Sequence, residues 1–175
     1  LVEVANEMNI GDFSHHPIIQ EPEGMASLID LARDASGGLA VGCSGGGGYR
    51  NREIAEASDY ILIHGNGQTR QKYYAMVREV QSWNLHKPIV CNEDSQALGN
   101  LGVAYKTGTS WGYYNNMTKQ EPPADWGITR GEDAFFAHRM AAGLGITVPA
   151  LPLKDQYYLQ GLEPNWSYRG QRWIR

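Results

Sequence analysis

Two glutamates, Glu7 and Glu93, stand where the sequence changes from apolar to polar, and each follows an asparagine. The runs before them, LVEVAN and KPIVCN, have the apolar and β-branched composition of buried strands. A buried strand has no use for a carboxylate at its end, whereas two converging carboxylates can break a glycosidic bond by acid–base and nucleophilic chemistry. Glu7 and Glu93 are therefore the first candidates for a catalytic pair.

Strand and helix patterns alternate along the chain and predict the elements that would position these residues. Strand-like runs occupy residues 1–6, 39–43, 59–64, 87–92 and 108–114. Helical spacing of apolar residues follows at 23–35, 51–57, 69–83, 95–105 and 131–142. Such alternation, at intervals of about 25 to 35 residues, predicts an α/β fold with parallel strands and right-handed crossovers.

Two architectures fit this alternation, an open doubly wound sheet and a (β/α)₈ barrel. An open nucleotide-binding sheet usually carries a glycine-rich phosphate turn directly before a helix. The only such run, CSGGGGYRN at residues 43–51, lacks the G-x-G-x-x-G spacing. We interpret it as a loop at a barrel rim, with a phosphate cradle as the alternative.

Polar residues gather at the predicted carboxyl ends of the strands, the edge at which parallel α/β folds bind ligands. Carboxylates could act as acid, base and nucleophile, amides and imidazole could bond hydroxyl groups, and an indole could stack on a sugar ring. The set consists of Asn6, Glu7, His64, Asn66, Asn92, Glu93 and Trp111. Its composition suits a carbohydrate.

The motifs VANE, PIVCNED and SWGYYN together resemble the large clan of retaining (β/α)₈ glycoside hydrolases. The resemblance implies that Glu7 is the acid/base at the end of strand four and Glu93 the nucleophile at the end of strand seven. It also implies that Asn6 bonds the sugar 2-hydroxyl and that His64 and Trp111 line the site. Residues 125–143 would form the closing helix.

This sequence departs from the clan's pattern in two ways. Asp94 follows the nucleophile, where an apolar or aromatic continuation is more usual, and we predict that it caps the helix at 95–105. The first three βα units are absent, so residues 1–146 would form strands four to eight of a barrel. We expect the exposed edges to be covered by a second copy or by a complementary N-terminal half, with the aromatic segment 147–175 contributing.

Two other function classes compete with the hydrolase. A catalytically incomplete barrel fragment could act as a non-enzymatic binding or assembly module. A phosphate-binding aldolase or isomerase would need a lysine or a metal set at the strand ends, and the sequence supplies neither. Since His15 and His16 are adjacent in an extended loop, they point in opposite directions, and we predict neither a metal nor another cofactor.

Composition restricts the partners further. Among the 175 residues, 42% are hydrophobic and the net charge is −4, with no cluster of Lys and Arg, which argues against nucleic acid. No apolar run approaches the ~20 residues needed to span a bilayer. Cys43 and Cys91 are expected to be small buried hydrophobic residues. The chain begins with Leu inside a strand, so the sequence leaves localisation open.

Overall fold

The computed structural model describes residues 1–95, 99–112, 132–147, 165–167 and 172–174. Its strands in the first part of the chain are β1 (Val2–Glu3), β2 (Val41–Gly42), β3 (Ile61–His64), β4 (Ile89–Glu93) and β5 (Ser110–Trp111). The helices among them are η1 (Gly11–Phe13), α1 (Pro17–Gln20), α2 (Pro22–Ala35), α3 (Arg52–Ala57), α4 (Arg70–Ser82) and α5 (Gly99–Thr107). The predicted α/β alternation is confirmed.

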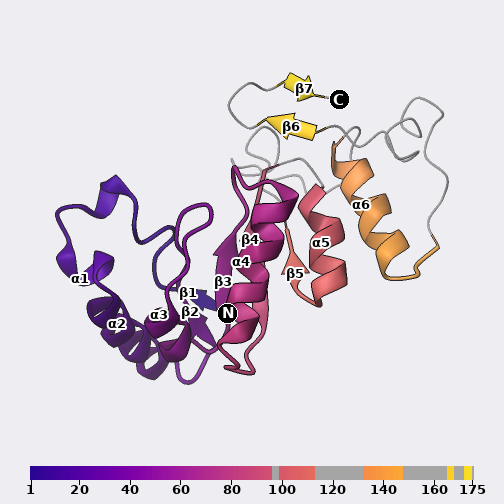
Figure 1. The fold of residues 1–175 in the computed structure, drawn as a ribbon. Coiled ribbons are helices and arrows are strands. Elements are labelled where there is room, and N and C mark those ends of the chain that lie inside the picture. Colours follow the sequence, from indigo (N-terminus) through magenta and orange to yellow (C-terminus); the bar gives the residue numbers. More distant parts are fainter. Residues whose placement is uncertain (96–98, 113–131, 148–164, 168–171, 175) are drawn as a thin grey trace, which may run out of the picture. The chain divides into compact units, whose positions relative to one another are not determined.

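The strands form two small parallel sheets. One pairs β1 with β2, and the other has the order β3-β4-β5, which lie side by side in Figure 1. The backbone N–H of Asp59 donates to the Val41 carbonyl at 2.8 Å and so links the two sheets just before β3. Strand succession along the sheets thus follows sequence order, as successive βα units predict.

The first two strands are shorter than the sequence predicts. Residues 1–6 and 39–43 were expected to be extended, but each ladder is two residues long. The apolar pattern continues beyond the paired residues because Val4, Ala5 and Cys43 still pack in the apolar core. Their backbones, however, are no longer part of a strand. Hydrophobic patterning reports burial, and burial here extends further than strand pairing.

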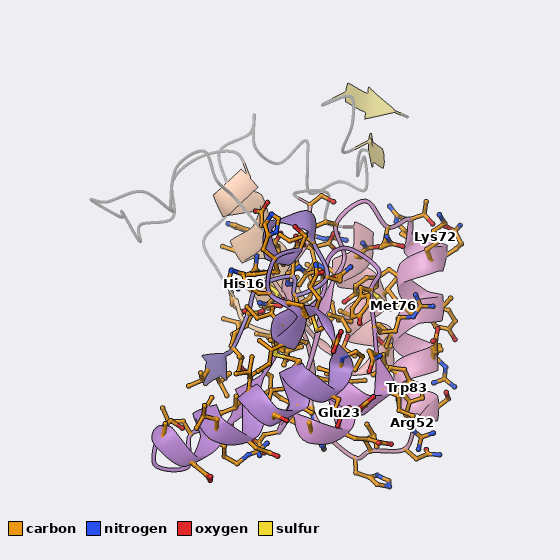
Figure 2. All side chains as sticks on the ribbon, turned by 90° about the vertical axis from the view of Figure 1, so that its left-hand side faces the viewer. His16, Glu23, Arg52, Lys72, Met76 and Trp83 are labelled. Atoms are coloured by element: carbon orange, nitrogen blue, oxygen red, sulfur yellow. The ribbon has the colours of Figure 1, made fainter. Side chains whose placement is uncertain are left out.

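The helices begin at the caps that their sequences indicate. Thr69 accepts a hydrogen bond from the Lys72 N–H at 3.3 Å, and Asn51 accepts one from the Ile54 N–H at 3.1 Å. On α4, Met76 is 2% exposed whereas Lys72 lies on the solvent side (Figure 2). The buried face of α4 is the predicted one, formed by Tyr73, Met76, Val77 and Val80.

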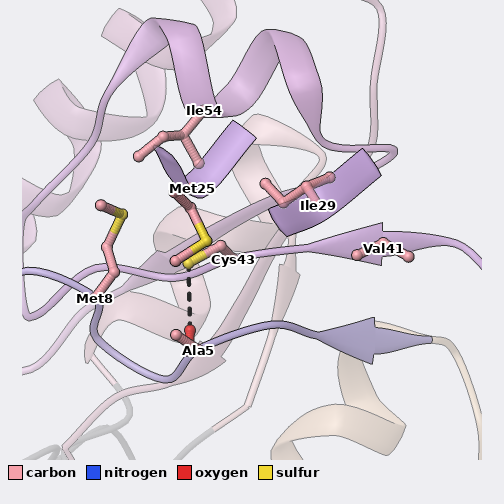
Figure 3. Packing of buried hydrophobic residues seen from close by; sticks show 7 residues of the cluster. All are labelled: Ala5, Met8, Met25, Ile29, Val41, Cys43 and Ile54. Atoms are coloured by element: carbon pink, nitrogen blue, oxygen red, sulfur yellow. Dashed lines mark hydrogen bonds between the residues drawn. The ribbon is translucent and has the colours of Figure 1, made fainter. Parts of the chain in front are cut away.

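A compact apolar cluster joins the first sheet to its helices. Figure 3 shows it, with the members Ala5, Met8, Met25, Ile29, Val41, Cys43 and Ile54. The Cys43 thiol lies 3.3 Å from the Ala5 carbonyl, and burial raises the pKa of this thiol to about 12. Burial likewise raises the pKa of Cys91 to about 12, and both cysteines are free. The prediction that they are buried hydrophobic residues is confirmed.

The chain divides into two compact units, Leu1–Asp94 with Asn100–Gly112, and Ser95–Gly99 with the chain after Gly112. The second unit holds α6 (Glu132–Gly143) and the antiparallel pair β6 (Asn165–Ser167) and β7 (Arg172–Ile174). The predicted helix at 131–142 is confirmed by α6. Most of segment 147–175, expected to cover the barrel, lies outside the described residues.

Candidate functional site

Three side chains from three strand ends meet at the carboxyl edge of the sheets. Glu7 follows β1, His64 ends β3 and Glu93 ends β4. The Nδ1 atom of His64 lies 2.9 Å from Glu7 Oε1 and 3.9 Å from Glu93 Oε2. One oxygen of each carboxylate and this nitrogen all lie within 4.8 Å of one another. Residues far apart in the sequence therefore form one cluster, the Glu7–His64–Glu93 cluster.

A strained turn presents Glu7. Its φ of 55° lies in the left-handed region, which costs a residue with a side chain about 1 kcal/mol. Ser44, at the end of β2, compensates this cost: its hydroxyl accepts the Glu7 N–H at 3.0 Å, and its carbonyl accepts the Met8 N–H at 3.0 Å. Strain held by neighbouring groups is common where a side chain has a functional role.

A break in the ladder directs Glu93 into the cluster. Ile63 pairs with Cys91, but the next residue, His64, pairs with Glu93, so that Asn92 is skipped. An extra residue of this kind changes the direction of the side chains that follow it. Asn66 then donates to Glu93 Oε1 at 2.6 Å, which leaves Oε2 as the oxygen nearer to His64.

The environment of His64 favours one tautomer. Its side chain is fully buried, and Nε2 has no hydrogen-bond partner within the described part of the chain. A proton on Nδ1 is donated to Glu7, whereas a proton on Nε2 would be a buried donor without an acceptor. The geometry thus favours the Nδ1–H form, which holds Glu7 Oε1 and leaves Glu7 Oε2 free to carry a proton.

The glycine-rich loop after β2 packs between the ends of β1 and β3. Gly46 donates its N–H to Asn9 Oδ1 at 2.7 Å, and Gly48 donates to the His64 carbonyl at 3.0 Å. A Cβ at Gly47 would lie 2.2 Å from the Asn66 carbonyl oxygen. Two of the loop's N–H groups are therefore already used, and the loop is a spacer that lets its neighbours approach. This arrangement disfavours the phosphate cradle.

The other predicted site residues have side chains that are exposed to solvent or bonded to residues outside the cluster. Asn6 is exposed, and its side chain makes no hydrogen bond to another described residue. Asn92 is exposed and donates to Glu3 Oε2 at 3.1 Å. Trp111 is 6% exposed, and its indole N–H donates to Asp94 Oδ2 at 2.8 Å. Their contacts with a sugar stay predictions, and for Trp111 the visible contact is with the protein.

Two residues near the site were not predicted as part of it. Ser44 supports the Glu7 turn, and the only sequence signal was its position after a strand. Asp94 was expected to cap the following helix, but α5 as described begins at Gly99, and residues 96–98 lie outside the described ranges. The capping role stays a prediction; within the described residues, Asp94 is fully buried and accepts hydrogen bonds from side chains of α5 and β5.

Two carboxylates and an imidazole are also a ligand set that divalent metals accept. A metal bound at Nδ1 would move the imidazole proton to Nε2, where no described residue accepts it. The hydrogen bond to Glu7 would be lost at the same time. The donor set therefore fits an imidazole that donates a hydrogen bond to Glu7 better than it fits a metal centre. His15 and His16 are both exposed (His16 is labelled in Figure 2) and are absent from this cluster.

Comparison with known proteins finds no matching family model, no similar curated protein and no similar solved structure. No helix among the described residues is both long and apolar enough to cross a membrane.

Proposed function

We propose that this protein is a retaining glycoside hydrolase, with Glu93 as nucleophile and Glu7 as acid/base. The observation that carries the proposal is that one oxygen of each carboxylate lies within 4.8 Å of one oxygen of the other, while each carboxylate has an oxygen held by the protein. Retaining enzymes need carboxyl groups about 5 to 5.5 Å apart, close enough to exclude a water molecule between nucleophile and sugar. Both side chains are partly exposed, at 20% and 19%, so a substrate can reach them.

The hydrogen bonds suggest a role for each oxygen in the first step. Asn66 holds Glu93 Oε1, so Oε2 is the oxygen that attacks the anomeric carbon. His64 donates to Glu7 Oε1, so the proton on Oε2 is the one given to the leaving oxygen. The bond from the anomeric carbon to the leaving oxygen breaks as its bond to Glu93 forms, which yields a covalent glycosyl ester.

The second step reverses the roles. Glu7, now ionised, removes a proton from a water molecule, and the water oxygen attacks the anomeric carbon. The ester bond to Glu93 breaks, and the sugar leaves with its original configuration. His64 keeps Glu7 in place through both steps because its Nδ1–H can donate to Oε1 of either the acid or the carboxylate form.

We further propose that β1 to β5 correspond to strands four to eight of a (β/α)₈ barrel. A contact between side chains of the non-adjacent strands β1 and β4 supports curvature of the sheets, since Glu3 meets Asn92 on one face. Among the described residues, β1 pairs only with β2 and β5 only with β4. These free edges support closure by a second copy or a complementary half. Light scattering across a concentration series tests self-association.

Glycosidase activity is tested with a panel of aryl glycosides. In a sugar that the wild type hydrolyses, Glu93→Gln should lower kcat by at least about 10³-fold, because an amide cannot form the ester. Glu7→Gln should lower it strongly as well, and added azide should restore activity by attacking the ester without a base. Glu56→Gln, an exposed acid paired with Arg52 on α3, is the matched control. Undiminished hydrolysis by Glu93→Gln would refute the assignment.

The second candidate function, a non-enzymatic assembly or binding module, is favoured by the strands β1 and β5, each of which pairs on one side only among the described residues. It predicts sugar binding or self-association without turnover. Wild-type protein that binds an oligosaccharide in calorimetry but releases no product from the panel would support this function over the hydrolase.

A further inference from the structure

Asp94 is a buried acid directly next to the proposed nucleophile, and the mechanism above does not use it. Its side chain is 0% exposed, and its Oδ2 accepts two hydrogen bonds. One comes from the Trp111 indole at 2.8 Å, and the other comes from the Asn100 amide at 2.9 Å. A buried carboxylate with two N–H donors is stable as a charged group and costly to disrupt.

The end of β3 also rests on this carboxylate. Gly65, the residue after β3, donates its N–H to the Glu93 carbonyl at 2.9 Å. A Cβ at position 65 would lie 2.2 Å from Asp94 Oδ2, so only glycine allows the two backbones to approach this closely. Asp94 therefore joins the ends of β3, β4 and β5 and the start of α5.

The position of this junction determines where Glu93 can point. The skipped residue in β4 leaves the ladder irregular at Glu93, so the ladder alone does not set the direction of its side chain. Glu93 is held on one side by the Gly65 N–H and is followed at once by the anchored Asp94. Fixing Asp94 thus fixes the backbone from which the nucleophile projects.

We propose that Asp94 is the positioning residue of the Glu7–His64–Glu93 cluster and that it sets the direction of Glu93 through its bonds to Trp111 and Asn100. This inference rests on the proposed function and deepens it. It also gives Trp111 a role beneath the site, as part of the anchor. A misplacement of reacting groups by about 1 Å can cost about 10²-fold in rate.

The kinetic test compares Asp94→Asn with Asp59→Asn. Asp59 lies before β3, at the opposite edge of the sheet, where it accepts the Val41 N–H at 2.8 Å, so its variant loses structural contacts away from the site. We expect Asp94→Asn to lower kcat by about 10²-fold with KM within about threefold. Asp59→Asn should lose stability and keep kcat. Equal kcat values for the two variants would overturn the proposal.

Trp111→Phe is the second variant and keeps the test valid if Asp94→Asn does not fold. It removes one donor to Asp94 and keeps an aromatic, though smaller, side chain, and kcat should fall about tenfold with KM little changed. An unchanged kcat in this variant would overturn the proposal as well.

A substrate-free measurement separates this inference from the proposed function. With carboxyl-labelled glutamate, the Glu93 carbon resonance, assigned by its absence in Glu93→Gln, is compared between the variants at one pH. Because loss of the anchor lets the Glu93 side chain take more than one direction, Asp94→Asn should shift and broaden this resonance, and Asp59→Asn should leave it in place. An identical resonance in wild type and Asp94→Asn would overturn the proposal, whether or not the wild type hydrolyses a glycoside.

Discussion

Glu93 and Asp94 are neighbours in sequence, and the structure places their carboxylates in opposite environments. Glu93 is partly exposed and meets His64 at the rim, with one oxygen left without a close hydrogen bond. Asp94 is fully buried and bonds side chains of α5 and β5. The first environment suits a group that reacts, and the second suits a group that holds others in place. The comparison teaches that the buried partners of an acid, more than its residue type, indicate its role.

The largest expected difference between the two acids is in stability. Asp94→Ala should lower the free energy of unfolding by about 3 kcal/mol, because the buried N–H groups of Trp111 and Asn100 lose the carboxylate that accepts from both. Glu93→Ala should change it by less than about 1 kcal/mol, because this side chain is partly exposed and the variant loses the single Asn66 hydrogen bond at the rim. Urea denaturation measures the free energy of unfolding of both variants. Similar losses of stability in the two would contradict the different roles of Glu93 and Asp94.

The packing around Asp94 gives the next effect. Gly65→Ala should destabilise by about 2 kcal/mol, since the added methyl group must displace the carboxylate. Gly102→Ala on α5 is the matched control, because nothing lies within 4 Å of its added methyl group, and it should stabilise by about 0.5 kcal/mol. Thermal unfolding of the two variants measures whether each is less or more stable than the wild type. A Gly65→Ala protein as stable as the wild type would contradict the claim that the Asp94 carboxylate is held tightly against Gly65.

A smaller effect is expected at the rim. Asn66→Ala removes the 2.6 Å bond to Glu93 Oε1 and frees that oxygen to rotate. Because a hydrogen bond to a charged group of this kind is lost, kcat of Asn66→Ala should fall about tenfold. Gln71→Ala, an exposed position on α4, serves as the control. Steady-state kinetics that show equal kcat for both variants would remove Asn66 from the site.

The smallest effect concerns Asp59, an acid that belongs neither to the Glu7–His64–Glu93 cluster nor to the hydrogen bonds around Asp94. The Val41 N–H, and after it Arg33, lower the pKa of Asp59 below its ordinary value of about 3.9. The folded state therefore gains stability above that value and loses it as the pH falls through the lowered pKa. Asp59→Asn should remove this part of the acid dependence. Denaturation of the wild type and of Asp59→Asn at pH 6 and at pH 3 measures this contribution. If both proteins lose the same free energy of unfolding between the two pH values, the prediction is contradicted.

The sequence predicts the elements well where one physical signal dominates. The caps Asn51 and Thr69 and the apolar face of α4 mark helix starts and burial, and both are local properties. Strand lengths are predicted less well, because the apolar residues of 1–6 remain partly buried after pairing ends at Glu3. Local pattern records burial and gives no account of where a ladder stops.

The site shows the same division. Glu7, His64, Asn66 and Glu93 were predicted from their places at strand ends, and the structure brings these four together. The burial of Asp94 and its bond to Trp111 could not be predicted, because the break in β4 that reverses the alternation leaves no local sequence signal. A position after a strand predicts nearness to the edge, and side-chain direction depends on the ladder of the neighbouring strand.

The most direct test of the central claim is covalent trapping of the nucleophile. The protein is incubated with a panel of 2-deoxy-2-fluoroglycosyl fluorides, in which fluoride leaves as the anomeric carbon bonds to the nucleophile and hydrolysis of the ester is slow. Peptide mapping by mass spectrometry should find the glycosyl group on Glu93, absent in Glu93→Gln and retained in Glu56→Gln. A label on another residue, or no label with any sugar of the panel, would contradict the account.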